Sequence, residues 1–326
     1  MTLATRAVLF AALAAAPALA QPAPARADAD PAALVDALNA VFGKHDGKRA
    51  AHTHGFCIKG SFAPTAEAGR LSKAPHLSAK GPWPVVGRFS MGGGNPAAPN
   101  TQKDNTRGLA IHIDLGDGNQ TDMVMITAPV FVAKSPEKFL ELLQTVASKD
   151  KAKIDAFFAA NPESTRQKAW LTARPVPASY ATTSYFGVHT FTLTNTDGVR
   201  RIIKWQLVPS AGEIGLTDEE AKSKAPDFYK PELTERLAKG PVEFTLTAIL
   251  GEPGDAVDDP TALWPEERQP VAMGTLSFSA LEDDAVCDAG IFDPANLVDG
   301  IEGPANDGVF QIRSPTYAVS FSRRAQ

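Results

Sequence analysis

Hydrophobic and polar positions alternate, or gather in short apolar runs, along two stretches of the chain. Each stretch predicts about four strands, at 52–62, 84–90, 109–115 and 122–132, and then at 188–195, 201–208, 242–250 and 271–278. Sharp turns separate two neighbouring pairs, with Asp117-Gly118-Asn119 after the third strand and Asp197-Gly198 after the fifth. Antiparallel strands at this spacing predict a closed barrel or a sandwich.

Helical periodicity appears between these strands and before them. Asp30 can cap a helix over 31–42, and Pro31 suits its first turn. Further helices are predicted to begin at Ser135, to span 153–160, to follow the Thr217/Glu220 capping box and to span 231–238. No internal repeat or long linker divides residues 30–326, so we expect a single α+β domain there.

The first twenty residues carry the pattern of an export signal. Arg6 gives a short positive region, residues 7–15 are apolar, and Ala18-Leu19-Ala20 is a small-residue cleavage site. The apolar stretch is too short to span a bilayer comfortably, although an uncleaved anchor is the alternative. We therefore expect residues 1–20 to be a cleaved signal peptide and residues 21–29 a disordered lead-in. The mature protein would then be periplasmic or secreted, without a membrane anchor.

Composition narrows the classes of function. The chain has 326 residues, of which 44% are hydrophobic and 21% charged, and its formal net charge is −5. It can bury a large core, and its scattered basic residues form no cationic run, which argues against nucleic-acid binding. Cys57 and Cys287 can form one disulfide in an oxidising compartment or remain two buried thiols. The sequence leaves both alternatives open.

A candidate for chemistry lies near the end of the chain. Arg313 precedes Tyr317 by one helical turn. Phenols bind metals poorly at neutral pH because they stay protonated, but a permanent guanidinium charge favours the phenolate, which suits ferric iron. This spacing alone is more typical of an ordinary amphipathic helix. The blocks Phe292-Asp293-Pro294 and Gly300-Ile301-Glu302 before it reverse that interpretation.

Together these blocks resemble the proximal haem-ligand region of haem catalases. Five earlier segments resemble catalase motifs in the same order, and they lie at 49–55, 84–90, 106–110, 129–131 and 187–191; the one at 106–110 is expected to be structural. The resemblance covers roughly residues 45–324. It implies an α+β fold with a closed eight-stranded antiparallel β-barrel and flanking helices. It also implies haem b as cofactor, with Tyr317 as the iron ligand.

The resemblance assigns roles to individual residues. His52 would be the distal acid–base residue, and Ser90 would hydrogen-bond it and fix its tautomer. Phe131 would stack over the haem, although plain core packing is compatible with this role, and His189 would lie near the haem edge. Arg313 would support the iron ligand. Three arginines would anchor the haem propionates: Arg49, Arg88 and Arg324.

Two positions depart from the catalase pattern. Ile126 stands where catalases have an asparagine that helps to orient hydrogen peroxide. Pro315 lies inside the predicted Tyr317 helix, where it removes a backbone donor and can kink the helix. Few residues follow Arg324, so we expect the wrapping segment of larger catalases to be absent. The resemblance is therefore to the barrel-only catalase-related peroxidases.

These observations predict a haem-dependent peroxidase that reduces hydrogen peroxide or organic peroxides with a small organic electron donor. True catalase activity is the first alternative, and a haem-binding barrel without turnover is the second. His52 argues against a carrier, because a carrier needs no acid–base group. A lipid-binding barrel without metal would leave the three arginines unexplained. The oligomeric state stays open, a homodimer included.

Overall fold

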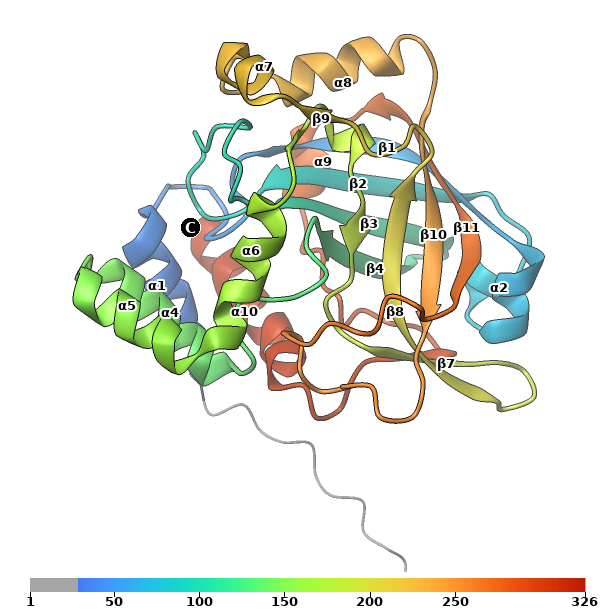
Figure 1. Cartoon of the computed structure of the whole chain (residues 1–326). Helices are drawn as coiled ribbons and strands as arrows, with labels where there is room; N and C mark the ends of the chain where they lie inside the picture. Colours follow the sequence, from blue (N-terminus) through green and yellow to red (C-terminus); the bar gives the residue numbers. More distant parts are fainter. Residues whose placement is uncertain (1–28, 326) are drawn as a thin grey trace, which may run out of the picture.

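Eight antiparallel strands close into a barrel in the computed structural model, which describes residues 29–325 (Figure 1). The ring closes where β8 pairs with β10. In spatial order its strands are β1 (Gly55–Pro64), β2 (Trp83–Met91), β3 (Arg107–Gly116), β4 (Asn119–Ile126), β6 (Tyr185–Phe186), β8 (Arg200–Pro209), β10 (Val242–Leu250) and β11 (Pro270–Leu281). The predicted closed barrel is confirmed, and the sandwich is excluded.

Both predicted hairpin turns are present. Asp117 and Gly118 have φ angles of 52° and 77°, and they connect β3 to β4. Gly198, with φ 78°, lies in the turn that connects β7 (Phe191–Thr194) to β8. Glycine adopts such positive angles without the steric cost that other residues meet, which explains the turn signals in the sequence.

Two predicted strands differ from those in the structure. The predicted strand at 122–132 ends at Ile126, and Pro129 beyond it has no backbone N–H to donate to a ladder. The predicted strand at 188–195 begins only at Phe191 and lies outside the ring, where β7 pairs with β8 and β12 (Ile301–Glu302). The short β6 instead occupies the position in the ring between β4 and β8. After β6 the chain leaves the ring, and His189 is buried in the connection to β7.

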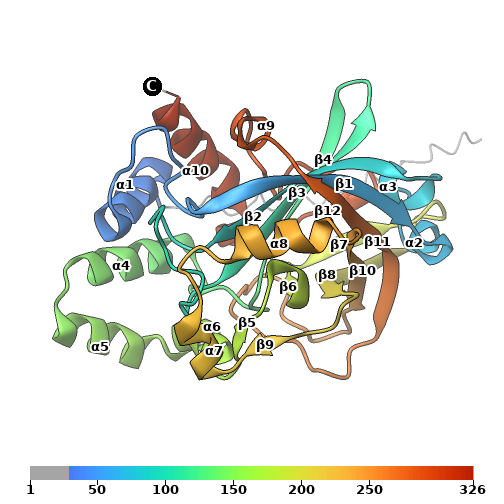
Figure 2. The same cartoon turned by 90° about the horizontal axis from the view of Figure 1, so that it is seen from above.

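Three helices pack together on one side of the barrel, as Figures 1 and 2 both show. They are α1 (Pro31–Phe42), α4 (Pro136–Ala147) and α10 (Gly308–Arg324). Leu34 and Leu38 of α1, Leu143 of α4 and Ile312 of α10 share one apolar cluster. Asp30 caps α1 as predicted, because its carboxylate accepts a hydrogen bond from the Ala32 amide at 3.1 Å.

The remaining elements are short and lie around the ring. The predicted capping box is present, since Thr217 and Glu220 bond each other's backbone amides. The helices are α2 (Ala66–Leu71), α3 (Pro75–Ser78), α5 (Lys151–Ala160), α6 (Arg166–Thr172), α7 (Asp218–Ser223), α8 (Tyr229–Leu237), α9 (Asp284–Asp288) and the 3-10 turns Pro162–Thr165 and Tyr180–Thr182; the small strands are β5 (Val176–Pro177) and β9 (Gly215–Leu216).

Aromatic side chains fill the interior of the barrel. The ring of Phe89 stacks on Tyr180, with 4.9 Å between centroids, and lies 5.7 Å from Phe278 and 6.0 Å from Tyr185. All four side chains are fully buried. Because the interior is packed, a ligand site must lie outside the barrel wall.

The predicted signal peptide and almost all of the predicted lead-in, residues 1–28, lie outside the described residues, as does Gln326. Among residues 29–325, no helix combines the length and the apolar character that a membrane crossing requires.

Candidate functional site

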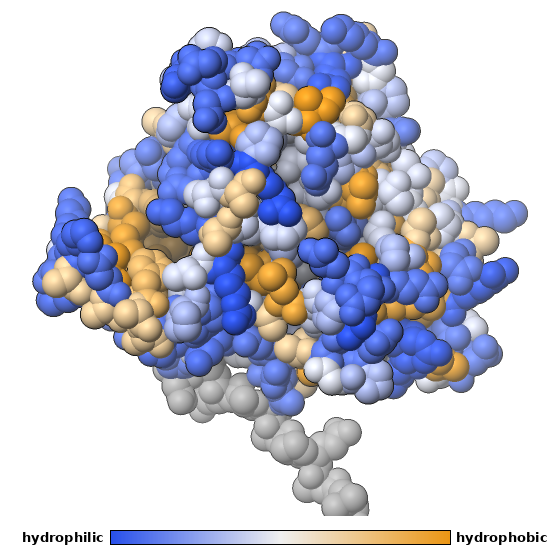
Figure 3. Space-filling view, viewed as in Figure 1, coloured by the Kyte–Doolittle hydropathy of each residue, from blue (hydrophilic) through white to orange (hydrophobic). Residues whose placement is uncertain are grey.

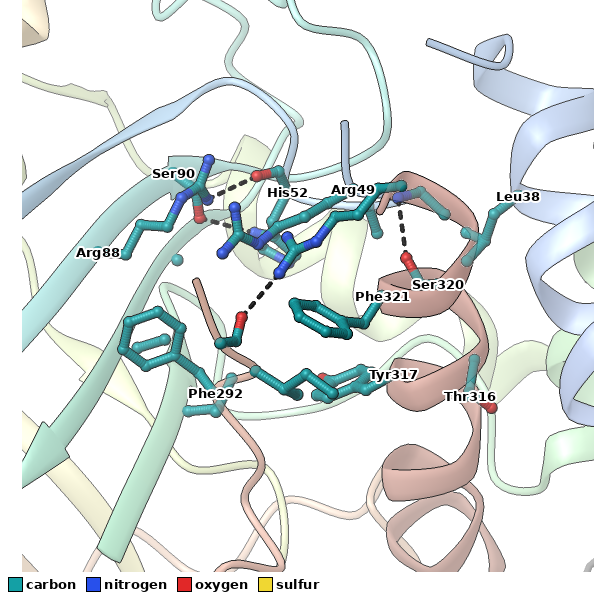
Figure 4. Close-up of a pocket in the computed structure, with 18 of the residues that line it drawn as sticks. Leu38, Arg49, His52, Arg88, Ser90, Phe292, Thr316, Tyr317, Ser320 and Phe321 are labelled. Carbon is teal, nitrogen blue, oxygen red and sulfur yellow. Dashed lines mark hydrogen bonds between the residues drawn. The ribbon is translucent and has the colours of Figure 1, made fainter. Parts of the chain in front are cut away.

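The candidate site lies between the outer face of the barrel wall and α10. Side chains alternate along β2, so that Phe89 points into the barrel while Arg88 and Ser90 line a cavity outside it. Two adjoining cavities of about 820 Å³ and 1610 Å³, their open mouths included, are both lined by His52 and Tyr317. Figure 4 shows these two side chains on opposite sides of the smaller cavity.

His52 is held at both its backbone and its ring. Its φ angle of 55° lies in the left-handed region, which is sparsely populated by residues other than glycine. Arg88 donates hydrogen bonds to the carbonyls of His52 at 2.7 Å and of Thr53 at 3.1 Å. Nδ1 of His52 and Oγ of Ser90 share a hydrogen bond of 3.0 Å. Since Ser90 occupies Nδ1, Nε2 is the ring nitrogen left for proton exchange.

Gly108 of β3 makes room for this pair. A Cβ atom at this position would lie 2.8 Å from both Nδ1 of His52 and Oγ of Ser90, closer than real Cβ contacts allow. Gly55 is constrained in the same way, because a Cβ there would lie 2.9 Å from the Arg88 guanidinium. Gly108 is not among the predicted site residues, although it lies in the 106–110 segment that resembles a catalase motif.

The surroundings of His52 keep its imidazole neutral. Burial lowers its pKa to about 4, and the nearby positive charges of Arg88, Arg313 and Arg49 act in the same direction. The ring is therefore uncharged at neutral pH. A neutral imidazole can accept a proton, which an imidazolium cannot.

Two of the predicted arginines are anchored by the last residues of α9 and by Gly290, which follows this helix. Arg49 pairs with the Asp288 carboxylate and donates to the Cys287 carbonyl at 2.6 Å. Arg324 donates to the carbonyls of Gly290 at 2.7 Å and of Asp288 at 3.2 Å. Sequence patterns gave no sign of Asp288, which lies 239 residues from Arg49.

The three arginines carry more positive charge than Asp288 can offset. Burial and the charge of Arg49 lower the pKa values of Arg88 and Arg324 to about 10, so both guanidinium groups stay charged at neutral pH. All three arginines line the smaller cavity. The excess charge suits an anionic ligand, carboxylates in particular.

Cys57 and Cys287 form a disulfide, which settles the alternative that the sequence left open. The bond connects β1 to α9 within residues 287–290, the segment that holds Arg49 and Arg324. Phe292, which follows this segment, lines the smaller cavity and stacks on His112, with 3.9 Å between ring centroids. The bridge therefore ties one wall of the cavity to the barrel.

Arg313 and Tyr317 meet on α10, as their spacing predicted. The phenolic oxygen accepts hydrogen bonds from Nε of Arg313 at 3.0 Å and from Nη2 at 2.6 Å. The helix runs unbroken from Gly308 to Arg324 in spite of Pro315. The phenolic oxygen is therefore held beside a permanent positive charge in the wall of both cavities.

His189 lies in the wall of the larger cavity, in the connection that follows β6. Its Nδ1 bonds the Asp307 carboxylate at 2.6 Å, and its buried Nε2 has no hydrogen-bond partner within residues 29–325. Burial lowers the pKa of His189, and the bond to Asp307 opposes this shift. Asp307 also caps α10 by accepting from the Phe310 amide at 3.0 Å, so it connects the loop to the helix that carries Tyr317.

The larger cavity is mostly apolar. Ile126 and Phe131 both line it, and Phe131 packs edge-to-face on Phe139 with 5.0 Å between centroids. The packing role of Phe131 is confirmed, and its stacking over a haem stays a prediction. On the face seen in Figure 3, apolar residues gather over α1, α4 and α5, which contribute much of this lining. His54 is not part of either cavity, and its Nδ1 bonds the Ala98 carbonyl at 2.6 Å.

Comparison with known proteins identifies the family. The family model described as Catalase matches residues 32–325. A catalase-related peroxidase of Synechococcus elongatus is 40% identical over 91% of this chain and 89% of its own length. A catalase-related peroxidase of Mycolicibacterium paratuberculosis is 35% identical over 90% and 94%. Catalase-2 of Bacillus subtilis is 31% identical over 83% of this chain and 43% of its own length. The chain belongs to the catalase family.

Proposed function

We propose that this protein is an exported haem b peroxidase that reduces hydrogen peroxide or organic peroxides with electrons from a small organic donor. The observation that carries the proposal is the pairing of a neutral His52, held by Ser90, with an Arg313-bonded Tyr317 on the opposite side of the cavity. The two relatives named catalase-related peroxidase, which match this chain along most of their length, support the same activity.

The donor set around the cavity fits a haem. Tyr317 would hold the iron, because its oxygen already accepts two bonds from Arg313. Arg49, Arg88 and Arg324 would hold the propionates, since their combined charge exceeds that of Asp288. A bound haem would supply the electrons that break the peroxide O–O bond and recover them from the donor.

The protein's own part in peroxide reduction is proton transfer. Neutral His52 would accept a proton from the peroxide and return it to the leaving oxygen, since Nε2 is free while Ser90 holds Nδ1. Arg88 holds the His52 backbone and Ser90 holds its ring, so the imidazole keeps its orientation between the two transfers. The positive charges that keep the ring neutral at rest also favour rapid return of the proton.

We place peroxidase activity ahead of true catalase activity because of Ile126. Its apolar side chain lines the cavity beside His52 and offers no hydrogen bond to hydrogen peroxide. Disproportionation needs a second peroxide molecule to be oriented as the reductant, whereas a peroxidase takes electrons from another donor. An organic peroxide also suits the apolar lining better than hydrogen peroxide does.

The purified holoprotein tests this proposal directly. With peroxide and an oxidisable dye we expect rapid dye oxidation and weak oxygen release. His52→Ala should slow peroxide reduction by about 100-fold, the scale of lost acid–base catalysis. His54→Ala is a matched control, because His54 lies two residues away and outside both cavities. Fast oxygen evolution without a donor would favour true catalase activity, and full activity of His52→Ala would refute the acid–base role.

Export is supported by the N-terminal pattern and by the disulfide, since such bonds persist in oxidising compartments. Expression of the full chain followed by cell fractionation should recover the protein outside the cytoplasm, with Gln21 as its first residue. Recovery from the membrane with Met1 retained would instead indicate an uncleaved anchor.

A further inference from the structure

A third cavity, mostly polar, adjoins the arginine side of the site. It has a volume of about 840 Å³, its open mouth included, and lies between loop 43–48 and the end of α10. Lys44 and Lys48 line it from the loop, and Arg323 and Arg324 line it from the helix. The proposed acid–base chemistry makes no use of this cavity.

Positive charge dominates the lining of this cavity. Lys44 and Lys48 are exposed, and neither has an ion-pair partner within residues 29–325. Arg323 pairs with Asp36 at 2.5 Å, outside the lining, and Asp46 is the only acidic residue in the described part of the lining. Asp288, whose negative charge acts on Arg324, is already paired with Arg49. At least two positive charges are therefore left without a counter-ion.

The polar cavity shares a wall with the proposed cofactor cavity. Ala50, Ser320 and Arg324 line both cavities. The Ala50 amide donates to Oγ of Ser320 at 3.2 Å, which closes the wall between loop and helix; this bond is the dashed line at Ser320 in Figure 4. A molecule in the polar cavity would be separated from the cofactor cavity by this single layer of residues.

We propose that the polar cavity binds the reducing substrate, and that this substrate is a small organic anion with an oxidisable hydroxyl group, such as a phenolic or enediol acid. The inference rests on the proposed peroxidase function. The acidic group would pair with Lys44 and Lys48, and the hydroxyl would lie toward the shared wall. Two donor molecules would each lose one electron and one proton. One peroxide molecule would take up these two electrons and two protons, which gives water and an alcohol from an organic peroxide, or two waters from hydrogen peroxide.

Charge reversal on the loop tests the proposal. Lys44→Glu/Lys48→Glu should lower kcat/KM for a sulfonated anionic dye by about tenfold or more, because attraction becomes repulsion. The value for a neutral phenol, and that for peroxide, should stay unchanged. Both lysines are exposed, so the fold should tolerate the change. Raising the salt concentration should weaken the dye reaction in the wild type more than in the variant.

A second double variant supplies the control. Lys80→Glu/Lys103→Glu changes the net charge equally, at exposed positions that do not line the polar cavity, and it should leave the dye reaction intact. Equal losses in the two double variants, or no loss in the first, would overturn the donor site. In either case, if the variants still oxidise the neutral phenol with peroxide, the proposed peroxidase function is not contradicted. A wild type that oxidises no donor would refute both.

Discussion

At His52, a strained backbone conformation and a hydrogen-bonded ring together fix the orientation of the imidazole. A positive φ angle on a residue other than glycine costs on the order of 1 to 3 kcal/mol, so neighbouring contacts must hold it. Arg88 bonds the His52 carbonyl, Ser90 bonds the ring, and Gly108 leaves the space that both need. The site therefore depends on a glycine that itself has no chemistry to contribute.

Gly108→Ala should damage catalysis while the barrel stays folded. The new methyl group would displace His52 or Ser90, because it would lie 2.8 Å from both. We expect peroxide reduction to slow by about 10- to 100-fold, through a lower kcat/KM for peroxide. Gly69→Ala is the control, since a methyl group there meets its nearest atom at an ordinary 3.4 Å and should cost no activity. An unimpaired Gly108→Ala would show that the His52–Ser90 bond is dispensable.

The pH dependence of peroxide reduction should report the titration of His52. Burial lowers its pKa to about 4, so the ring is neutral and able to accept a proton above that pH. We expect kcat/KM for peroxide to stay level from about pH 8 to pH 5 and to fall as the pH approaches 4, because protonation removes the base. Loss of activity centred near pH 6.5, the ordinary pKa of histidine, would contradict the lowered pKa of His52.

Residue pairs that lie close in sequence, or in motifs, could be predicted from the chain alone. Arg313 with Tyr317 is an example, since their contact follows from helical spacing. Asp288 and Asp307 could not be predicted, because each meets its partner only through the tertiary fold and neither stands in a recognisable pattern. The counter-charges of a site are therefore harder to read from a sequence than its motifs.

At the scale of elements, short strands and connections escaped prediction. A two-residue strand such as β6 has no periodicity of its own, and its neighbours β4 and β8 define it. Long elements with a cap or a hairpin turn, such as α1 and β3, matched closely. The boundaries that matter for the site are at Ile126, where the chain leaves the sheet, and at Phe191, where it rejoins the sheet; the residues next to them line the larger cavity.

The Cys57–Cys287 bridge should matter most for retention of the cofactor. It closes a span of 230 residues, and the chain-entropy model gives a stabilisation of about 5 kcal/mol as an upper value. Cys57→Ser/Cys287→Ser should lower Tm and also speed dissociation of hemin, because the segment that holds Arg49 and Arg324 loses its tie to the barrel. Hemin dissociation is measured well below Tm, where the variant is folded, by transfer to apomyoglobin. An unchanged rate would mean that the bridge serves the fold alone.

At the scale of the whole molecule, the packed barrel acts as a support. Its aromatic interior leaves no room for a ligand, so the chemistry lies where the outer wall meets α1 and α10 (Figure 1). The resemblance of spaced motifs predicted the barrel and the arginines, His52 and Tyr317 that line the smaller cavity. It did not reveal the polar cavity beside them, because Lys44, Lys48 and Arg323 belong to no motif and meet only in the folded chain.

Titration of the purified protein with hemin, followed by absorption spectroscopy, tests the central proposal most directly. We expect one haem per chain in a high-spin ferric state with a tyrosinate charge-transfer band, because Arg313 supports the phenolate of Tyr317. Tyr317→Phe should lose that band and hold haem weakly, while Tyr180→Phe, which changes a tyrosine buried in the barrel core, should keep the band. A wild type that stays colourless and takes up no hemin, or an unchanged spectrum in Tyr317→Phe, would contradict the account.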